Sequence, residues 1–290
     1  MKRSLITLLS LSLLFGLSTG CADEDDDLGD GGSDVTDPQP KPRPEPKPGE
    51  WFRPTAEMTW QWQITGKLNA SYDVDVYDID AFENSAETVA ALHGQGQWVV
   101  CYFSAGSYEP WQADADTYPA ADIGKPLADW PDERWVDHRS EAIRAILAAR
   151  MDIAAEKGCD AVEPDNVTAY RNDSGFDITA EDQLAFNRWL ATEAHARGMG
   201  VALKNDDEQV AELAGVFDFS VAEECHAFDE CSAYQPFLDQ DKPVFNAEYA
   251  ESAGEAQALA TTLCAKALAF NTRTLVLPWD LDDTFRVSCD

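Results

Sequence analysis

Segments with strand-like and helix-like patterns alternate through most of this chain, and the alternation limits the folds that it can adopt. Eight short apolar runs are typical of buried strands, and they lie at residues 59–65, 74–80, 98–104, 158–168, 199–205, 218–225, 243–249 and 272–279. Segments with helical periodicity separate most of them, as at 139–157 and 179–197. Repeated strand and helix units form parallel α/β sheets. Eight strands therefore predict a (β/α)8 barrel of the TIM type, with an open doubly wound sheet as the alternative.

The start of the chain does not share this pattern. Residues 1–20 have a basic start, an apolar run and a small-residue exit, which are typical of a secretory signal peptide. Cys21 follows directly, as in bacterial lipoproteins, and is a candidate lipidation site; ordinary secretion is the alternative. Residues 21–50 are acidic and then proline-rich, which predicts a disordered tether. The barrel is expected at 51–290, in an exported lipoprotein of the outer membrane or cell surface.

The charge of the chain restricts its partners. The sequence has 54 acidic and 21 basic residues, a formal net charge of −33. Such a chain repels nucleic acid and anionic membrane surfaces, so we expect contact with a membrane only through the lipid anchor. A cationic or neutral partner is favoured, although solvation of an extracellular surface explains the acidity equally well. We expect a monomer.

Six cysteines remain after Cys21, and in an exported protein an even number indicates disulfides. The pairs that we predict are Cys225 with Cys231, which would brace the loop after an acidic strand, and Cys264 with Cys289. Cys101 and Cys159 lie in strands that are expected to be neighbours. A third disulfide and two free buried thiols both remain open for them.

Two of the expected strands begin apolar and end acidic. They read GCDAVEPDNVT and DFSVAEEC, and they deliver Glu163 and Asp165 from the first and Glu223 and Glu224 from the second. Burial of ionised carboxylates costs several kcal/mol unless they are paired or hydrated. Because the strands of a barrel end at one mouth, we expect an acid pair there, with a structural ion-pair network as the alternative.

Side chains alternate along a strand, so the positions in phase with Asp165 should point into the barrel. The candidate binding residues found in this way, together with Trp62 of the first strand, are Asp78, Tyr102, Ser104, Glu163, Lys204 and Glu248. Each has a structural alternative; Lys204, for example, would also serve to neutralise a buried acid. The loop after residue 106 is long and rich in Trp, Asp and Pro, and it predicts an ordered rim over a binding face.

The chemistry that best fits two carboxylates in different environments is acetal hydrolysis. One acid must protonate the leaving oxygen while the other attacks or stabilises the anomeric carbon. Lys204 would lower the pKa of one carboxyl and keep it ionised. The sequence has no HExxH, glycine-rich phosphate loop or GxSxG motif, and its four histidines lack metal-ligand spacing, so we predict neither a metal nor a cofactor.

Several motifs in unbroken order resemble glycoside hydrolase family 114, the endo-α-1,4-polygalactosaminidase-like proteins. They are VYDIDAF (76–82), CYFSAGSYE (101–109), KGCDAVEPDN (157–166), ALKND (202–206), AEEC with its C-x5-C (222–231) and AEY (247–249). The resemblance implies a (β/α)8-type fold that cleaves α-1,4-linked galactosamine or N-acetylgalactosamine polymers. It also implies that Asp165 is the nucleophile and Glu223 the general acid/base.

One departure from the family bears on this assignment. Glu224 stands where the family commonly has glutamine, which leaves Glu224 as the alternative acid; strand alternation favours Glu223. A retaining enzyme would place the carboxyls of Asp165 and Glu223 about 5 Å apart, and a spacing beyond about 6.5 Å would indicate inversion. A non-catalytic surface binder of cationic aminosugar polymers is the main alternative function, and a sugar lyase is a weaker one. The aromatic residues of the long loop suit either stacking on sugars or packing against the barrel.

Overall fold

The structure is a computed structural model that describes residue 47 and residues 49–290. The expected signal peptide, the lipidation site Cys21 and nearly all of the tether lie outside the described residues. In the part that is described, no helix combines the length and the apolar character needed to cross a membrane.

Eight parallel strands follow one another in sequence order in the main sheet. They are β1 (Trp60–Gln63), β2 (Val76–Asp80), β3 (Trp98–Ser104), β7 (Ala161–Asp165), β8 (Gly200–Lys204), β9 (Phe219–Glu223), β10 (Val244–Ala250) and β11 (Arg273–Pro278). A short ninth strand, β12 (Val287–Ser288), pairs antiparallel with β11. The chain therefore has the strand number and order predicted for the barrel.

The sheet curls until its first and last strands share one interior. Every parallel strand contributes a buried apolar side chain to a single cluster: Trp60, Val76, Trp98, Ala161, Ala202, Phe219, Phe245 and Leu275. Among the described residues no backbone ladder joins β1 to β11. The seam is instead held by single bonds, such as that from Trp60 Nε1 to Arg273 O (2.8 Å). The (β/α)8-type barrel is confirmed, with a seam that the sequence pattern did not reveal.

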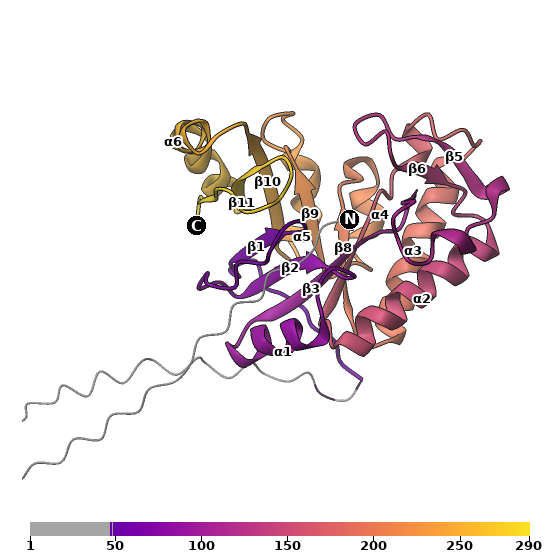
Figure 1. Ribbon diagram of the computed structural model, residues 1–290. Coiled ribbons are helices and arrows are strands. Elements are labelled where there is room, and N and C mark those ends of the chain that lie inside the picture. Colours follow the sequence, from indigo (N-terminus) through magenta and orange to yellow (C-terminus); the bar gives the residue numbers. More distant parts are fainter. Residues whose placement is uncertain (1–46, 48) are drawn as a thin grey trace, which may run out of the picture. The chain divides into compact units, whose positions relative to one another are not determined.

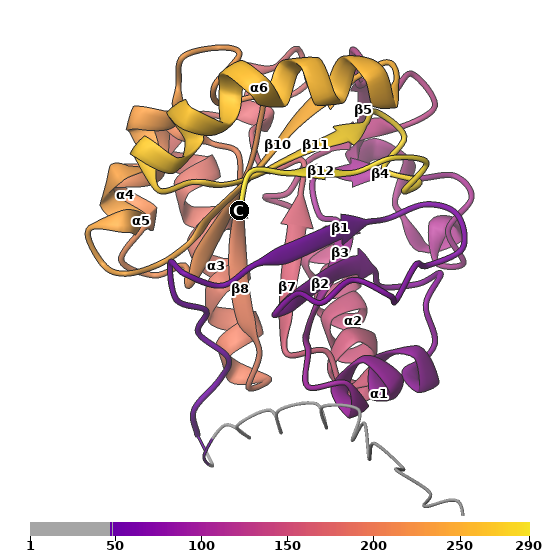
Figure 2. The same ribbon diagram turned by 90° about the vertical axis from the view of Figure 1, so that its left-hand side faces the viewer.

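The helices cover the outside of this sheet (Figure 1). The longer ones are α1 (Ala86–Gly94), α2 (Glu141–Lys157), α3 (Ala180–Ala196) and α6 (Ala253–Phe270), whereas α4 (Val210–Leu213) and α5 (Gln235–Leu238) are single turns. Short 3-10 helices lie at Ala115–Thr117, Ala120–Asp122, Ala169–Arg171, Asp207–Gln209 and Cys231–Tyr234. Figure 2 shows α6 lying across β10 and β11. Among the described elements, no helix follows β1, which is a departure from a regular (β/α)8 pattern.

The long loop after β3 is an ordered structure, as predicted. It forms a small antiparallel sheet from β4 (Ser107–Tyr108), β5 (Ile123–Pro126) and β6 (Arg134–Val136), with β6 in the middle. Arg150 of α2 is fully buried and binds Glu109 (2.9 Å) and Asp114 (2.8 Å) of this loop. The same guanidinium donates to Ser104 O at the end of β3 (2.9 Å). One side chain therefore fastens the loop to both the barrel and its outer helix.

Three disulfides are present. Cys225 pairs with Cys231 and Cys264 with Cys289, as predicted. Cys101 of β3 pairs with Cys159, just before β7, which decides the alternative left open for these two residues. Cross-links of this kind form and persist in oxidising compartments.

Candidate active site

The carboxyl ends of the strands surround a cavity of about 850 Å³. Seven parallel strands contribute one side chain each to its lining: Trp62, Asp80, Tyr102, Asp165, Lys204, Glu223 and Tyr249. The long loop adds Trp111, Trp130, Glu133 and Trp135 along one wall. The polar ends of the strands and the aromatic loop thus face the same space, and the loop forms the expected rim.

Lys204 is the point on which the acids converge. Its Nζ lies 3.1 Å from Asp165 Oδ1 and 3.3 Å from Glu223 Oε2. A third carboxylate oxygen, Glu163 Oε1, is also 3.3 Å away, and only 3% of the lysine side chain is exposed. Burial alone would lower the pKa of Lys204, but attraction to these carboxylates outweighs it and raises the pKa well above its ordinary value. The lysine is therefore a fixed positive charge between the two candidate catalytic acids.

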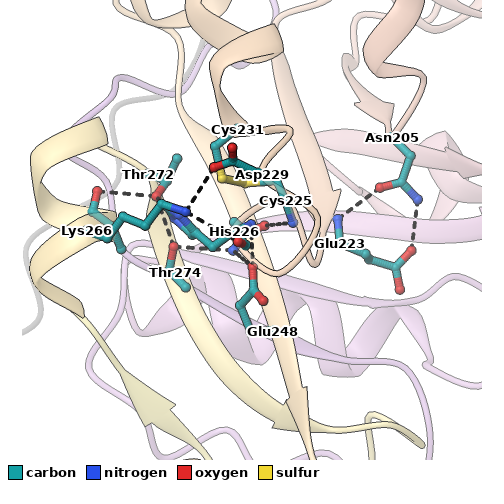
Figure 3. Close-up of a disulfide and its surroundings, with 12 residues drawn as sticks. Asn205, Glu223, Cys225, His226, Asp229, Cys231, Glu248, Lys266, Thr272 and Thr274 are labelled. Atoms are coloured by element: carbon teal, nitrogen blue, oxygen red, sulfur yellow. Dashed lines mark hydrogen bonds and ion pairs between the residues drawn. A yellow bond between two sulfur atoms is a disulfide. The ribbon is translucent and has the colours of Figure 1, made fainter. Parts of the chain in front are cut away.

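Glu223 has the more complete set of hydrogen bonds. Its Oε1 accepts a very short bond from the Tyr249 hydroxyl, and its Oε2 accepts from Asn205 Nδ2 at 3.0 Å. Asn205 Oδ1 in turn accepts from the Glu223 backbone N–H at 2.9 Å, so the two residues clasp each other (Figure 3). Burial opposes ionisation of Glu223, but the Lys204 charge and these bonds prevail and lower its pKa.

Asp165 is held from the opposite side of Lys204. Its Oδ2 accepts a hydrogen bond from the Tyr102 hydroxyl at 3.1 Å, and its Oδ1 accepts from the Asn166 backbone N–H at 2.6 Å. The two candidate acids therefore belong to one cavity and share one counterion. This arrangement permits one carboxyl to attack while the other exchanges a proton.

The backbone turns sharply after each of the three central side chains. Asn166, Asn205 and Glu224 follow Asp165, Lys204 and Glu223, and they have φ angles of 61°, 49° and 53°. Asparagine adopts this left-handed conformation readily, but for glutamate it is unusual and costs free energy. Strained backbone of this kind gathers at functional sites, where the surrounding structure imposes it.

The chain is similar to known proteins in sequence and in structure. Residues 41–290 match the sequence pattern of glycoside-hydrolase family GH114. The chain belongs to family GH114. It is a glycoside hydrolase, and the family resemblance of its motifs is confirmed.

Two solved structures are similar to this GH114 chain. Ega3 from Aspergillus fumigatus, solved in complex with galactosamine, is 36% identical with a TM-score of 0.77; the match covers 85% of this chain and 99% of that one. The glycoside hydrolase domain of PelA from Pseudomonas aeruginosa has a TM-score of 0.61 at 19% identity, covering 79% of this chain and 97% of that one, and supports the fold. None of the curated protein sequences compared with the chain matches it significantly.

Three of the expected binding residues of this GH114 chain are buried behind the cavity. Asp78 and Glu163 lie one layer deeper than the lining, and Ser104 is covered by the turn that contains Ser107. Burial raises the pKa of Asp78 well above its ordinary value and that of Glu163 to about 7. Repulsion by Glu163 raises the pKa of Asp78 further, whereas the Lys204 charge opposes the rise at Glu163. The expectation that these three side chains line the cavity is corrected, because alternation along a strand gives the face but not the depth.

Glu248 was also expected to point into the barrel, and the structure corrects this. Tyr249 takes the inward place on β10, since Ala247 pairs with the inward residue Glu223. Glu248 instead lies under the loop after β9, where its Oε1 accepts from the His226 backbone N–H (2.9 Å) and from Asn246 Nδ2 (3.0 Å) (Figure 3). It supports the backbone next to Glu223 and does not face the cavity.

Three polar side chains that line the cavity were missed by reasoning from the sequence: Asn205, Tyr249 and Glu133. The first two follow an expected inward residue directly, within the motifs ALKND and AEY, so a shift of one position would have found them. Glu133 lies in the long loop, where no periodicity indicates direction. Cys225, His226 and Cys231 are close enough to hold a metal ion, but the two sulfurs are bonded to each other, so this group does not offer three free ligands.

Proposed function

We propose that this enzyme cleaves polymers of α-1,4-linked galactosamine or N-acetylgalactosamine within the chain, with Asp165 as nucleophile and Glu223 as general acid/base. The observation that carries the proposal is the contact of both carboxylates with the Lys204 ammonium in one open cavity. Glu224, the alternative acid, has no such contact with Lys204.

The same contacts favour retention of configuration. Asp165 Oδ1 and Glu223 Oε2 lie 3.1 Å and 3.3 Å from one nitrogen atom. The sum of these distances, 6.4 Å, is the largest separation that these two oxygens can have. This limit favours the spacing of about 5–5.5 Å found in retaining enzymes over the range of about 6.5–9.5 Å that inverting enzymes need for a water molecule. Attack by Asp165 would form a glycosyl ester, and Glu223 would then deprotonate the water that hydrolyses it.

The lowered pKa of Glu223 has a consequence for the first step. The leaving oxygen must receive a proton from Glu223, so this group has to be protonated when the glycosidic bond breaks. A carboxyl with a lowered pKa holds that proton only at acidic pH. Cleavage by this mechanism is expected to be faster at acidic pH than at pH 8.

Charge and similarity support an aminosugar substrate. The net charge of −33 attracts the ammonium groups of a deacetylated polymer, and this attraction weakens as salt rises. Ega3, to which the chain is similar, was solved with galactosamine. A second cavity of about 570 Å³ adjoins the first and shares Glu224, Tyr249 and Trp279 with it, which gives a long chain room on both sides of the acids.

The Asp165→Asn variant tests the proposal against a non-catalytic binder. Loss of the nucleophile should abolish cleavage of a galactosamine polymer and leave its binding nearly unchanged. The exposed loop residue Asp116 provides a control, since Asp116→Asn removes the same charge away from the cavity. Wild-type protein that binds the polymer without releasing shorter products would establish the binder instead.

The cellular location forms part of the same proposal. Three disulfides support export to an oxidising compartment, and Cys21 is proposed as the site of a lipid anchor on a monomeric enzyme at the outer membrane or cell surface. Metabolic labelling with a fatty acid should mark the wild-type protein and not the Cys21→Ser variant.

A further inference from the structure

A third carboxyl on the cavity wall has no part in the mechanism above. Glu133 lies just before β6 in the long loop, half-buried, and its side chain lines the cavity. Its backbone is fixed by hydrogen bonds on both sides, from its own N–H to Trp130 O (2.9 Å) and from the Leu127 N–H to its carbonyl oxygen (3.0 Å). The carboxyl is therefore presented to the cavity by an ordered segment.

A buried chain of hydrogen bonds ends on this carboxyl. Ser107 Oγ donates to Glu133 Oε2 at 2.5 Å, the hydroxyls of Ser107 and Ser104 are 2.6 Å apart, and Asn166 Nδ2 donates to Ser104 Oγ at 2.9 Å. An ionised Glu133 can only accept, so Ser107 gives it the one hydroxyl proton that it has, and Ser104 then donates to Ser107. All the donors therefore point in one direction, from Asn166 toward Glu133.

This direction determines which oxygen of Glu133 is available to a ligand. Oε2 accepts the bond from Ser107, and within residues 49–290 no side chain or backbone group is hydrogen-bonded to Oε1. While Ser107 donates to Oε2, a proton taken up by the carboxyl goes to Oε1. Glu133 can then offer an O–H donor to a molecule in the cavity.

The chain also places Glu133 relative to the two catalytic acids. Ser104 of β3 is paired in the sheet with Asp165 of β7, whereas Glu223 stands two strands farther on, in β9. Glu133 thus flanks Asp165 on the side away from Glu223. With the roles proposed above, the sugar that becomes bonded to Asp165 is the glycone, and Glu133 lies near that carboxyl.

The charges around Glu133 favour its neutral form. Burial raises its pKa to about 7, which the bond from Ser107 opposes. The groups facing it are Glu109 from the long loop and Asp165, which raise the pKa further, Lys204 from β8, which lowers it, and the Tyr102 hydroxyl from β3. A neutral carboxyl can donate to an uncharged oxygen, whereas an ionised one can only accept.

We propose that Glu133 is a substrate-binding residue that holds the glycone sugar by donating a hydrogen bond from Oε1 to an uncharged oxygen, either a hydroxyl or the carbonyl of an acetamido group. This inference rests on the proposed roles of Asp165 and Glu223. It adds a contact that selects the sugar by its oxygen atoms, in an otherwise anionic cavity that attracts amines.

Calorimetry with an uncharged α-1,4-linked N-acetylgalactosamine oligomer tests this contact. The host is Glu223→Gln, which prevents hydrolysis and keeps the charges of Glu109, Asp165 and Lys204 that face Glu133. Its affinity is compared with that of Glu223→Gln/Glu133→Gln between pH 5.5 and 8.5. The amide keeps a donor and cannot ionise. At pH 5.5 we expect the two proteins to bind the oligomer with affinities within about twofold of each other. At pH 8.5 the protein that keeps Glu133 should bind about fivefold to tenfold more weakly than the glutamine variant, which corresponds to the loss of one hydrogen bond.

The comparison of the two proteins isolates the effect of Glu133, because other groups that titrate in this pH range change the affinity of both proteins equally. Glu163, whose pKa is also about 7, titrates in both and cancels. Asp116→Asn in the same host should behave like the host. In Glu223→Gln/Glu133→Ala, affinity at pH 6 should fall about fivefold to tenfold, because the donor is gone at every pH.

Several outcomes would overturn the role of Glu133. The first is that Glu223→Gln and Glu223→Gln/Glu133→Gln show the same change of affinity with pH, and the second is that the affinity of Glu223→Gln rises with pH. The third is that Glu223→Gln/Glu133→Ala binds the oligomer as tightly as Glu223→Gln does at pH 6. The fourth is that Glu223→Gln does not bind the oligomer at any pH. Failure of the wild-type enzyme to cleave a galactosamine polymer would instead refute the proposed function, and the binding comparison would still decide the role of Glu133.

Discussion

Replacement of Lys204 by methionine, which preserves length and removes the charge, should destabilise the fold strongly at pH 8. The ammonium is the common partner of Glu163, Asp165 and Glu223 at 3.1–3.3 Å, and its side chain is only 3% exposed. Removal of one member of a buried ion pair costs about 3–5 kcal/mol, because the remaining charge is left uncompensated. The free energy of unfolding of Lys204→Met should fall by about that amount.

The pH dependence of the effect follows from the carboxyls that Lys204 contacts. Loss of Lys204 raises the pKa of Glu163 and of Glu223 in the folded state, because the positive charge that lowers both is gone. A group whose folded pKa lies above its unfolded value costs nothing below the unfolded pKa, and its cost grows as pH rises through the folded pKa. The difference from wild type should therefore be largest above pH 7 and small near pH 4.

Urea unfolding followed by tryptophan fluorescence at pH 5 and pH 8 measures this difference. Lys157→Met is a control, because Lys157 Nζ donates to the carbonyl oxygens of Ala81 (2.6 Å) and Asn84 (2.7 Å). Its charge lowers the pKa of one carboxyl, Asp80, so the cost of its loss should depend on pH less than the cost of losing Lys204. A Lys204→Met protein that loses less than about 1 kcal/mol at pH 8 would refute the reasoning. So would a loss that does not shrink on acidification.

Three further changes test other features of the site. Glu224→Asn relieves a left-handed backbone that glutamate rarely adopts, so the free energy of unfolding should rise by about 0.5–1 kcal/mol, and a loss would contradict this. Glu163→Gln should stabilise the fold by up to roughly 3 kcal/mol at pH 8 and not at pH 4, because the pKa of Glu163 is raised to about 7. Urea unfolding curves of the variant and the wild type that coincide at both pH values would contradict this prediction. In Gly106→Ala the new Cβ would lie 1.7 Å from Asn166 O, so kcat should fall at least about tenfold; unchanged kinetics would show that the turn yields freely.

The eight strands could be predicted because each is a buried apolar run with a polar end, and this pattern follows from the parallel barrel itself. Asp165, Lys204 and Glu223 were found for the same reason. Glu248 was assigned to the wrong face because β10 offers two alternating sets, one with Phe245 and Tyr249 and one with Glu248, and the sheet register decides between them. A single sequence does not contain that register.

Depth and loop geometry were likewise beyond sequence reasoning. Asp78 and Glu163 have the same alternation as the cavity residues, yet they lie below the level that a ligand can reach. Glu133 comes from a loop whose small sheet depends on contacts with the barrel. Local sequence patterns report which side chains of a regular strand share a face, and contacts between distant segments decide which face points inward and how deep each side chain lies.

The way in which Arg150 secures the long loop has a consequence for how enzymes of this build can diverge. The groups proposed to break the bond stand at the ends of strands, while much of the wall proposed to face the polymer belongs to the long loop, which Arg150 attaches to the outer helix α2. Recognition and chemistry are thus carried by different parts of the chain. The sequence of the long loop can therefore change, and with it the polysaccharide that is bound, without a change in the reaction. This requires that the contacts of Arg150 with the loop are kept.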